Sequence, residues 1–366
     1  MSANLDTYNS AMLVGEIGEF KLIERLARSI ERRNRAVSSG LTPAGSAIKI
    51  GIGDDAAAWS TRAGITVATT DTMVDGVHFV LDLIPWRDLG WKAMAVNLSD
   101  IAAMGCIPAY ALVTLGLHES LSVEGLEEMY AGMVDACEAN GVIIAGGDIV
   151  KSPVFFITVA IEGQAPTGVA SSSETALLRR DAVSPGDVVA VTGHLGCSAG
   201  GLKLISGSGT TGGIGDAAAE DHLKQAHFRP TPRVAEGIAL VGAGVRAAID
   251  ISDGLLDDLG KLCRASEVSA TVRAHDLPMD ATLNLAFPDN QIDLAMAGGE
   301  DYELLFTAPE GIVSRITHIL ETPVTVIGEI EEGPSHVTVL DEAGTVMPVK
   351  DGGWDHFAGI RDNRTI

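Results

Sequence analysis

Apolar side chains recur every three or four residues in several stretches of the chain, and this spacing predicts helices. The first stretch covers residues 17–35 and has a polar opposite face, as an amphipathic helix does. The stretch Pro85–Met104 is apolar almost all round, which is typical of a buried helix, and it ends at Gly105. Further helices are expected over residues 123–140, 198–206 and 232–241.

Between these helices lie short segments with the alternation or the β-branched content of strands. They are residues 48–52, 65–70, 110–117, 154–162 and 188–192. A stretch rich in Pro, Gly and Ser between Ala165 and Thr175 interrupts the pattern. Because 366 residues exceed what one hydrophobic core normally serves, we expect two domains, residues 1–165 and 166–366, of a mixed α/β class.

The composition narrows the possible functions. The formal net charge of -24 argues against binding to nucleic acid, which needs clustered Lys and Arg. No run approaches the 18 apolar residues of a membrane span, and residues 1–10 lack the basic and apolar regions of a signal peptide. The four cysteines are widely spaced, so we expect reduced, buried thiols and a cytoplasmic location.

Acidic residues recur in short glycine-flanked motifs where strands are expected to end. The motifs are Gly51–Asp55, Thr69–Asp71, Gly146–Asp148, Ile249–Gly254 and Gly298–Asp301. A single Asp beside Gly is more often an ordinary turn residue, but five such motifs in one chain favour a shared site. Carboxylates on separate loops, together with phosphate oxygens, are how proteins hold Mg²⁺. The motifs therefore predict a nucleotide–metal site.

Asp100 is the most informative single position, because it lies within the apolar helix predicted over residues 85–104. Asn97 is three positions away and shares a helix face with it. A buried carboxylate is strongly unfavourable without a partner, so Asp100 needs a metal ion or a network of hydrogen bonds. The surplus of acids over bases favours the metal.

Three familiar nucleotide-binding patterns do not account for an ATP site in this sequence. Gly207–Gly212 fits GxGxxG, but it follows a helical pattern and leads into more glycine, which indicates a loop. The chain has no GxxxxGK[ST] motif and none of the protein-kinase signals. Any ATP site in this protein is therefore neither a P-loop nor a protein-kinase site.

The motifs in their order resemble those of the thiamine-monophosphate kinase family, which belongs to the aminoimidazole-ribonucleotide-synthetase-like (PurM-like) superfamily. The resemblance extends over almost the whole chain and rests on Gly18–Phe20, Gly53–Asp55, Thr70–Thr72, Gly76–Phe79, Asn97–Gly105, Gly146–Asp148, Arg229–Arg233, Ser252–Gly254, Gly299–Leu304 and Gly353–Phe357. It implies an N-terminal α/β domain that forms a homodimer with its copy, and a C-terminal α/β domain. The implied substrates are ATP and thiamine monophosphate.

The resemblance also implies roles for individual residues. The magnesium ligands would be Asp55, Thr69, Thr70, Asp71, Asp100, Asp148, Asp250 and Asp253, with Asp253 acting in catalysis through the metal. The nucleotide contacts would be Gly147, Asp148, Arg180 and Ser252. The acceptor contacts would be His78, Glu300 and Trp354. His78 and Trp354 also have structural interpretations, as a histidine at a strand end and as a C-terminal packing anchor.

The expected reaction is direct transfer of the γ-phosphate of ATP, with no general base. The acceptor is a phosphate monoester whose second pKa is near 6, so its attacking oxygen is already mostly ionised at pH 7.

Alternative functions remain open within the superfamily, such as an aminoimidazole ribonucleotide synthetase. Selenophosphate synthetases need a reactive residue near the N-terminus, and the first cysteine here is Cys106; hydrogenase-maturation proteins are expected to end in a Cys-bearing tail, whereas this chain ends at Ile366. A non-catalytic divalent-metal-binding module is the alternative from another class.

Overall fold

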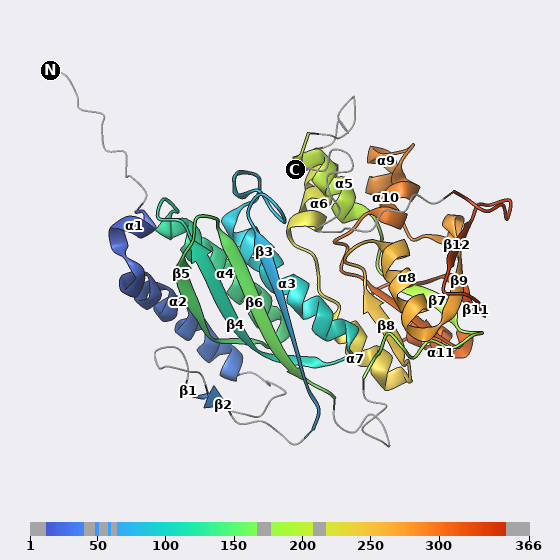
Figure 1. Ribbon diagram of the computed structural model, residues 1–366, viewed down its shortest axis with the longest axis horizontal. Helices are drawn as coiled ribbons and strands as arrows, with labels where there is room; N and C mark the ends of the chain where they lie inside the picture. The colour runs from blue at the N-terminus through green and yellow to red at the C-terminus, as the bar shows by residue number, and fades with distance from the viewer. Residues whose placement is uncertain are drawn as a thin grey trace.

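The computed structural model describes residues 12–39, 48–50, 58–59, 64–166, 177–207 and 217–348. Figure 1 shows two α/β halves side by side, with helix α3 along their junction. The mixed α/β fold expected from the sequence is confirmed. Among the described helices, none combines the length and the apolar character needed to cross a bilayer.

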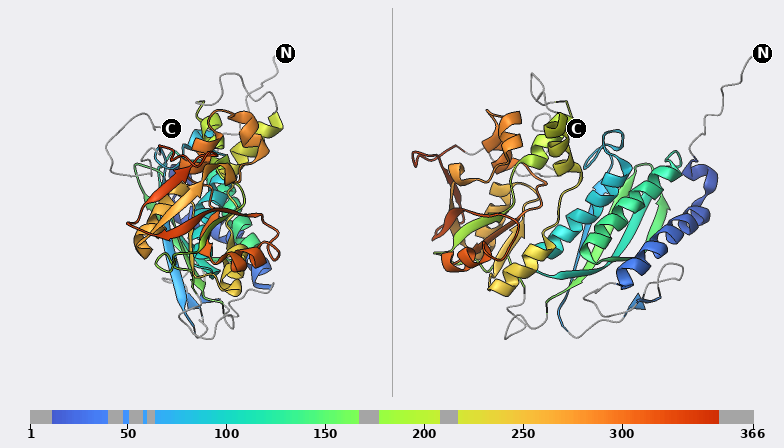
Figure 2. Two further views of the ribbon diagram at one scale, coloured as in Figure 1. Left: turned by 90° about the vertical axis from the view of Figure 1, so that its right-hand side faces the viewer. Right: turned by 180° about the vertical axis from the view of Figure 1, so that it is seen from behind.

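The first half contains a four-stranded sheet in the order β3-β6-β4-β5. Its elements are α1 (Val14–Ile17), α2 (Glu19–Ser39), β1 (Ile48–Ile50), β2 (Ala58–Trp59), β3 (Thr66–Val74), the 3-10 helix η1 (Leu81–Leu83), α3 (Trp86–Ala103), β4 (Ile107–Leu117), α4 (Val123–Asn140), β5 (Ile143–Lys151) and β6 (Phe156–Gln164). Strands β3 and β4 flank β6 in antiparallel pairs, and β4 pairs with β5 in parallel. Helices α2, α3 and α4 lie over one face of the sheet (Figure 2, right).

Helix α3 is buried along almost its whole length, as its apolar pattern predicts. Two close approaches hold it between its neighbours. A Cβ atom at Gly90 of α3 would lie 1.8 Å from the Met129 carbonyl oxygen of α4, and one at Gly237 would lie 2.1 Å from the Ala102 carbonyl oxygen of α3. Any larger residue at either position would push the helices apart, so glycine permits the tight packing. These contacts fix the helix that carries Asp100.

The second half contains a six-stranded sheet in the order β12-β9-β11-β7-β10-β8. Its elements are β7 (Val188–Thr192), α5 (Cys197–Ile205), α6 (Ala217–Phe228), α7 (Val234–Ala243), β8 (Ala247–Asp250), α8 (Leu255–Ser266), β9 (Val268–Arg273), the 3-10 helix η3 (Ala274–Asp276), α9 (Ala281–Ala286), α10 (Gln291–Ala297), β10 (Leu304–Ala308), α11 (Glu310–Ile316), β11 (Val324–Glu332) and β12 (Val337–Leu340). Four pairs of neighbouring strands are antiparallel, and β12 runs parallel to β9. Strand β8, at one edge, packs against α3.

One hydrophobic core continues through the junction of the two halves. Leu98 and Ile101 of α3 belong to the same buried cluster as Leu240 of α7 and Phe306 of β10. A second cluster lies within the C-terminal half, where Leu259 of α8 packs on the strands. Burial of apolar surface therefore holds α3 against both halves.

The predicted elements agree with the structure except at some of their ends. The helix over residues 123–140 and the strand over residues 188–192 match α4 and β7. Ser122 caps α4, since its hydroxyl accepts a hydrogen bond from the Gly125 N–H at 3.2 Å. Strand β5 and helix α6 were not predicted, because glycines interrupt β5 and a glycine-rich stretch precedes α6. Most of the GxGxxG motif lies outside the described residues.

A buried ion pair joins α7 to the C-terminal sheet and leads to a prediction on stability. Arg233 donates two hydrogen bonds, of 2.7 and 2.5 Å, to the Glu303 carboxylate, which also accepts one of 2.6 Å from the Thr192 hydroxyl. Arg233→Met leaves that carboxylate buried without a counter-charge, so we expect a loss of about 3–5 kcal/mol. Urea unfolding, followed by circular dichroism, measures the change.

The matched control is Arg179→Met, which removes an exposed arginine from its pair with Asp181. Exposed ion pairs contribute less than about 1 kcal/mol, so this variant should unfold near the wild-type midpoint. An equal loss of unfolding free energy in the two variants would show that the buried Arg233–Glu303 pair stabilises the protein no more than an exposed pair does.

Candidate active site

Three carboxylates from three different elements meet at the junction of the two halves. Asp71 lies on β3, Asp100 on α3 and Asp250 at the end of β8. The Thr69 hydroxyl donates a hydrogen bond of 2.5 Å to Asp100, and the Ser99 hydroxyl donates one of 2.7 Å to Asp250. Among the described residues, these bonds leave several of the carboxylate oxygens available to another ligand.

The group is electrostatically costly in the absence of a cation. Burial, followed by the charges of Asp100 and Asp253, raises the pKa of Asp71 to about 6. Burial and the charge of Asp100 raise the pKa of Asp250 to about 7, and burial raises the pKa of Asp100 itself. The positive charge of Arg180 opposes the rise in both Asp100 and Asp250. Clustered carboxylates of this kind are characteristic of functional sites.

The contacts of Asn97 confirm the prediction that Asn97 and Asp100 share one face of α3. The Asn97 side-chain oxygen accepts a hydrogen bond of 3.0 Å from the Asp71 backbone N–H. Its amide group donates to the Ala93 carbonyl oxygen at 3.1 Å. Asn97 and Asp100 therefore both face β3, and together they fix how the helix lies against the strand.

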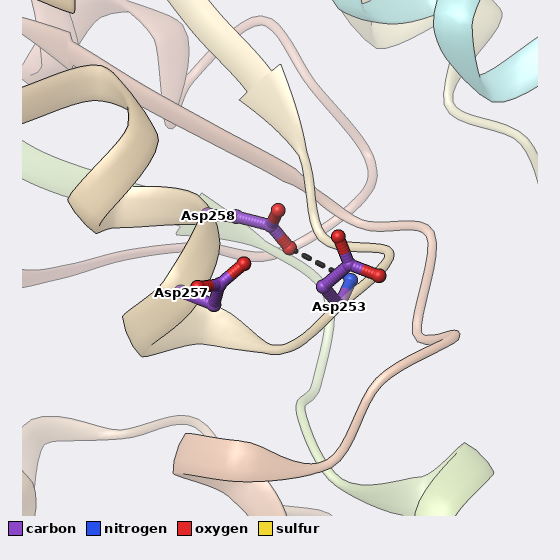
Figure 3. Close-up of side chains that lie close together, drawn as sticks. All are labelled: Asp253, Asp257 and Asp258. Atoms are coloured by element: carbon purple, nitrogen blue, oxygen red, sulfur yellow. Dashed lines mark hydrogen bonds between the residues drawn. The ribbon is translucent and has the colours of Figure 1, made fainter. Parts of the chain in front are cut away.

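A second acidic group lies in the loop between β8 and α8 and in the first turn of α8. It is formed by Asp253, Asp257 and Asp258, whose carboxylate oxygens lie within 4.8 Å of one another (Figure 3). Asp258 accepts hydrogen bonds of 3.0, 3.0 and 3.2 Å from the backbone N–H groups of Ser252, Asp253 and Gly254. Asp258 therefore shapes the loop that presents Asp253.

Lys261 supplies the counter-charge for that acidic group. Its ammonium lies 2.7 Å from Asp258 and 3.1 Å from Asp257, and it also contacts Asp253. Asp253 nevertheless acts electrostatically on Asp71, so it connects this loop with the three carboxylates at the junction. The predicted metal ligands that the structure brings together are thus Thr69, Asp71, Asp100, Asp250 and Asp253.

Two predicted ligands do not join this group within the protomer. The register of the strands defines one row of residues across the sheet. The row runs from Thr72 of β3 through Thr158 of β6 and Thr114 of β4 to Asp148 of β5. Side chains alternate along a strand, so Asp148 and Thr70 point to the face of the sheet away from α3. Strands β3 and β5 are also opposite edges of the sheet, roughly 14 Å apart at normal strand spacing.

The predicted nucleotide contacts fall into two places. Ser252 and Arg180 lie close to the carboxylates at the junction. Ser252 is in the β8–α8 loop, and Arg180 is near enough for its positive charge to lower the pKa of Asp100. Gly147 lies on β5, beside Asp148. A Cβ atom at Gly147 would lie 2.0 Å from the Val113 carbonyl oxygen, so strand packing alone requires glycine there.

The predicted acceptor contacts His78 and Glu300 lie close enough for their charges to interact. The imidazole Nδ1 of His78 accepts a hydrogen bond of 3.1 Å from the Val74 backbone N–H. Burial alone would raise the pKa of Glu300, but the charge and the hydrogen bond of Lys92, together with the neighbouring His227 and His78, lower it overall. Asp55 and Trp354, also predicted from the sequence, lie outside the described residues.

Several residues of the site were missed at the level of sequence. They are Lys92, His227, Asp258 and Lys261. A signal existed for Lys92, because a lone lysine within an apolar helix needs a buried partner just as Asp100 does. No comparable signal marks His227, since its partners are remote in sequence.

Comparison with known proteins identifies the family of this chain. The models for AIR synthase related protein, N-terminal and C-terminal domains, match residues 53–165 and 184–341. Thiamine-monophosphate kinase of Escherichia coli K12 is 36% identical over 346 residues, covering 93% of this chain and 98% of that protein. The chain belongs to the thiamine-monophosphate kinase family. It is therefore an enzyme of this family, and the Bacillus subtilis member is 35% identical over 85% of the chain and 94% of its own length.

Solved structures of the family have the same architecture. Thiamine-monophosphate kinase from Stenotrophomonas maltophilia superposes with a TM-score of 0.73 at 37% identity, over 85% of this chain and 95% of that one. AaThiL complexed with AMPPCP and TMP superposes with a TM-score of 0.70 at 32% identity, over 95% of this chain and 100% of that one. The hydrogenase maturation protein HypE in complex with ATP, at 20% identity and a TM-score of 0.69, shares the fold.

Proposed function

We propose that this enzyme transfers the γ-phosphate of ATP directly to thiamine monophosphate and forms thiamine diphosphate, the last step in making that coenzyme. The observation that carries the proposal is the meeting of Asp71, Asp100 and Asp250 at the junction of the two halves, in a chain of the thiamine-monophosphate kinase family. The complex of AaThiL with AMPPCP, an ATP analogue, and TMP supports the same pair of substrates.

The site has the donors that magnesium ions require. It offers carboxylate and hydroxyl oxygens from Thr69, Asp71, Asp100, Asp250 and Asp253. Burial, followed by the charge of Asp100, raises the pKa of both Asp71 and Asp250, so a bound cation would favour their ionised forms. Mg²⁺ bound by them would neutralise charge on the phosphates of both substrates. The roles of Asp55, Thr70 and Asp148 as further ligands stay predictions.

The protein's own groups would position the two substrates. Arg180, whose charge already acts on Asp100 and Asp250, and Ser252 in the β8–α8 loop would contact the nucleotide, with Gly147 and Asp148 as further predicted contacts. Glu300 would face the thiazolium cation of the acceptor, with His78 beside it. In-line transfer between positioned phosphates needs little covalent chemistry from the protein, so no general base is assigned.

The proposal includes a homodimer formed through the face of the four-stranded sheet that α2, α3 and α4 leave uncovered among the described residues (Figure 1). Leu112 and Val150 on this sheet are each 41% exposed, and the row from Thr72 to Asp148 lies on that face. Exposed apolar side chains on a sheet are typical of a surface that another chain covers.

Two further parts of the proposal concern organisation and location. The domains are taken as residues 1–165 and 166–366, a division that agrees with the two segments matched by the family models. All four cysteines are described, and each is a buried free thiol. Reduced thiols fit the cytoplasmic location expected from the sequence.

An assay of ATP consumption across a panel of acceptors tests the proposed function. The panel comprises thiamine monophosphate, aminoimidazole-type ribonucleotide precursors, other phosphate monoesters and no acceptor, and the products are identified by chromatography. ADP and thiamine diphosphate formed in equal amounts, and only with thiamine monophosphate, would support the proposal. Turnover of another acceptor in its place, or of none, would contradict it.

Removal of magnesium is expected to abolish ATP binding and turnover together. Without the metal, the clustered carboxylates repel the phosphates, so ATP should lose at least about 100-fold in affinity, on the scale of the several kcal/mol of charge stabilisation that a metal supplies. Calorimetric titration with ATP after EDTA treatment, and again after Mg²⁺ is restored, measures this. Equal ATP affinity in both states would contradict the metal role, and equal Mg²⁺ affinity with and without ATP would favour a simple metal-binding module.

A further inference from the structure

A charged cluster beside the carboxylates joins the two halves of the protein, and none of the roles given above accounts for it. Lys92 of α3 is 1% exposed, and its ammonium lies 3.0 Å from Glu300 Oε1 and 3.2 Å from His227 Nε2. His227 lies at the end of α6, and Glu300 in the segment between α10 and β10. Three elements from both halves thus converge on one buried lysine.

The direction of each hydrogen bond in this cluster follows from the chemistry of its members. An ammonium group can only donate, so His227 Nε2 accepts from Lys92 and the imidazole proton lies on Nδ1. Nδ1 is 3.1 Å from the Ser198 hydroxyl and 3.5 Å from Glu300 Oε2. Burial, followed by the charge of Lys92, lowers the pKa of His227 to about 4, so the ring is neutral at pH 7. Lys92 therefore contacts Oε1 of Glu300, and the neutral His227 ring, which hydrogen-bonds Lys92 and Ser198, lies beside Oε2.

Stability alone does not explain why this lysine is buried. Burying a charged pair contributes little net free energy compared with well-packed apolar side chains. The exposure is also one-sided, because the side chain of Glu300 is 30% exposed while that of Lys92 is 1% exposed. The cation is hidden and the carboxylate is presented, which is the arrangement of a supported contact residue.

The backbone around Glu300 is held in an unfavourable conformation. Glu300 has a φ of 65° and Tyr302 a φ of 53°, in the left-handed region that non-glycine residues seldom occupy. Backbone hydrogen bonds from Glu300 to the Ser252 carbonyl oxygen, 2.8 Å, and from Tyr302 to the Ile251 carbonyl oxygen, 2.9 Å, maintain it. Such conformations concentrate at functional sites, and this one ties Glu300 to the strand end that carries Asp250.

We propose that Lys92 and His227 are positioning residues that hold the Glu300 carboxylate correctly oriented for the cationic part of the acceptor. This inference rests on the proposed function, because it takes thiamine monophosphate as the acceptor and Glu300 as its contact. Lys92 and His227 engage the inner side of the carboxylate, and its exposed side faces the acceptor. Among the residues that the structure describes, the other charged or titratable neighbours of Glu300 are His78, Asp301 and Tyr302.

A double-mutant cycle tests whether Lys92 acts through Glu300. Lys92→Met keeps the length of the side chain and removes its charge, and we expect the KM for thiamine monophosphate to rise about 10- to 100-fold, the range of a charge-assisted hydrogen bond. The kcat and the KM for ATP should change less than about threefold, a range set by the usual context dependence of such contacts. Glu300→Gln should give a similar rise, and Lys92→Met should add almost nothing to it.

Variants of His227 supply a second, independent measurement with Lys92 in place. His227→Asn puts an amide donor near the position of Nδ1, so it should retain most of the acceptor affinity. His227→Leu lacks any donor and should raise the KM for the acceptor without affecting that for ATP. If Lys92→Met does not yield folded protein, this comparison carries the test, and equal acceptor KM in the two His227 variants would overturn the inference.

Two outcomes of the cycle would also overturn it. One is a Lys92→Met enzyme with an unchanged acceptor KM. The other is a rise in KM that is equal for the acceptor and for ATP and that persists in the Glu300→Gln background. A lysine that merely holds the two halves together would give that result. Failure of the proposed function is distinguishable from both, since the wild-type enzyme would then not phosphorylate thiamine monophosphate at all.

Discussion

Asp100→Asn is expected to lower kcat by at least about 10³-fold while the protein stays folded. The amide preserves the shape of the side chain, but it lacks the charge that a hard cation requires, and metal-assisted stabilisation accounts for several kcal/mol of a phosphoryl-transfer barrier. Burial already raises the pKa of Asp100, so the neutral amide removes repulsion from the site. We therefore expect an unchanged or higher melting temperature, as often occurs when functional sites are neutralised.

The assay is steady-state turnover of thiamine monophosphate at saturating Mg²⁺, with thermal unfolding monitored in parallel. Asp181→Asn is the matched control, because Asp181 is an exposed carboxylate paired with Arg179 at 2.6 Å and adjoins Arg180 in the sequence. The control should retain kcat within about twofold, as surface substitutions usually have small effects. Wild-type turnover in Asp100→Asn would exclude Asp100 as a metal ligand.

Transfer to thiamine is expected to be at least about 10³-fold slower than transfer to thiamine monophosphate. The phosphate acceptor is already mostly ionised at pH 7, whereas an alcohol needs a general base, which typically contributes 10²–10⁴-fold to such reactions. The described acids near the site are either proposed metal ligands or engaged in other contacts: Asp301, for example, accepts backbone hydrogen bonds from Gly196 and Ser198. No residue has been assigned to remove a proton from an alcohol.

Rapid-quench experiments with γ-labelled ATP follow both acceptors in the same enzyme preparation. Labelled thiamine diphosphate should form in the first turnover without label passing through the protein, because no activated nucleophile was identified in the sequence. Thiamine monophosphate labelled from free thiamine at a comparable rate would disprove the ionised-acceptor mechanism. Label trapped on acid-quenched protein would show a phosphorylated enzyme and contradict direct transfer.

Most of the secondary structure could be predicted from local patterns in the sequence. The all-round apolar pattern of residues 85–104 predicted a buried helix, and α3 is one, since such a face is stable only when protein covers it. The spacing of Asn97 and Asp100 also predicted correctly that they share a face. Both results depend on local geometry, which repeats every 3.6 residues regardless of the rest of the fold.

Only the tertiary structure decided which acidic motifs meet. Thr69 and Thr70 are neighbours in the sequence, but their side chains point to opposite faces of β3, and the strand order places Asp148 at the far edge of the sheet from Asp71. Lys92 and His227 are 135 positions apart, and they meet only because α3 is buried between the two halves. Strand order and the packing of the halves depend on burial of apolar surface from remote segments, which the periodicity of any one segment does not record.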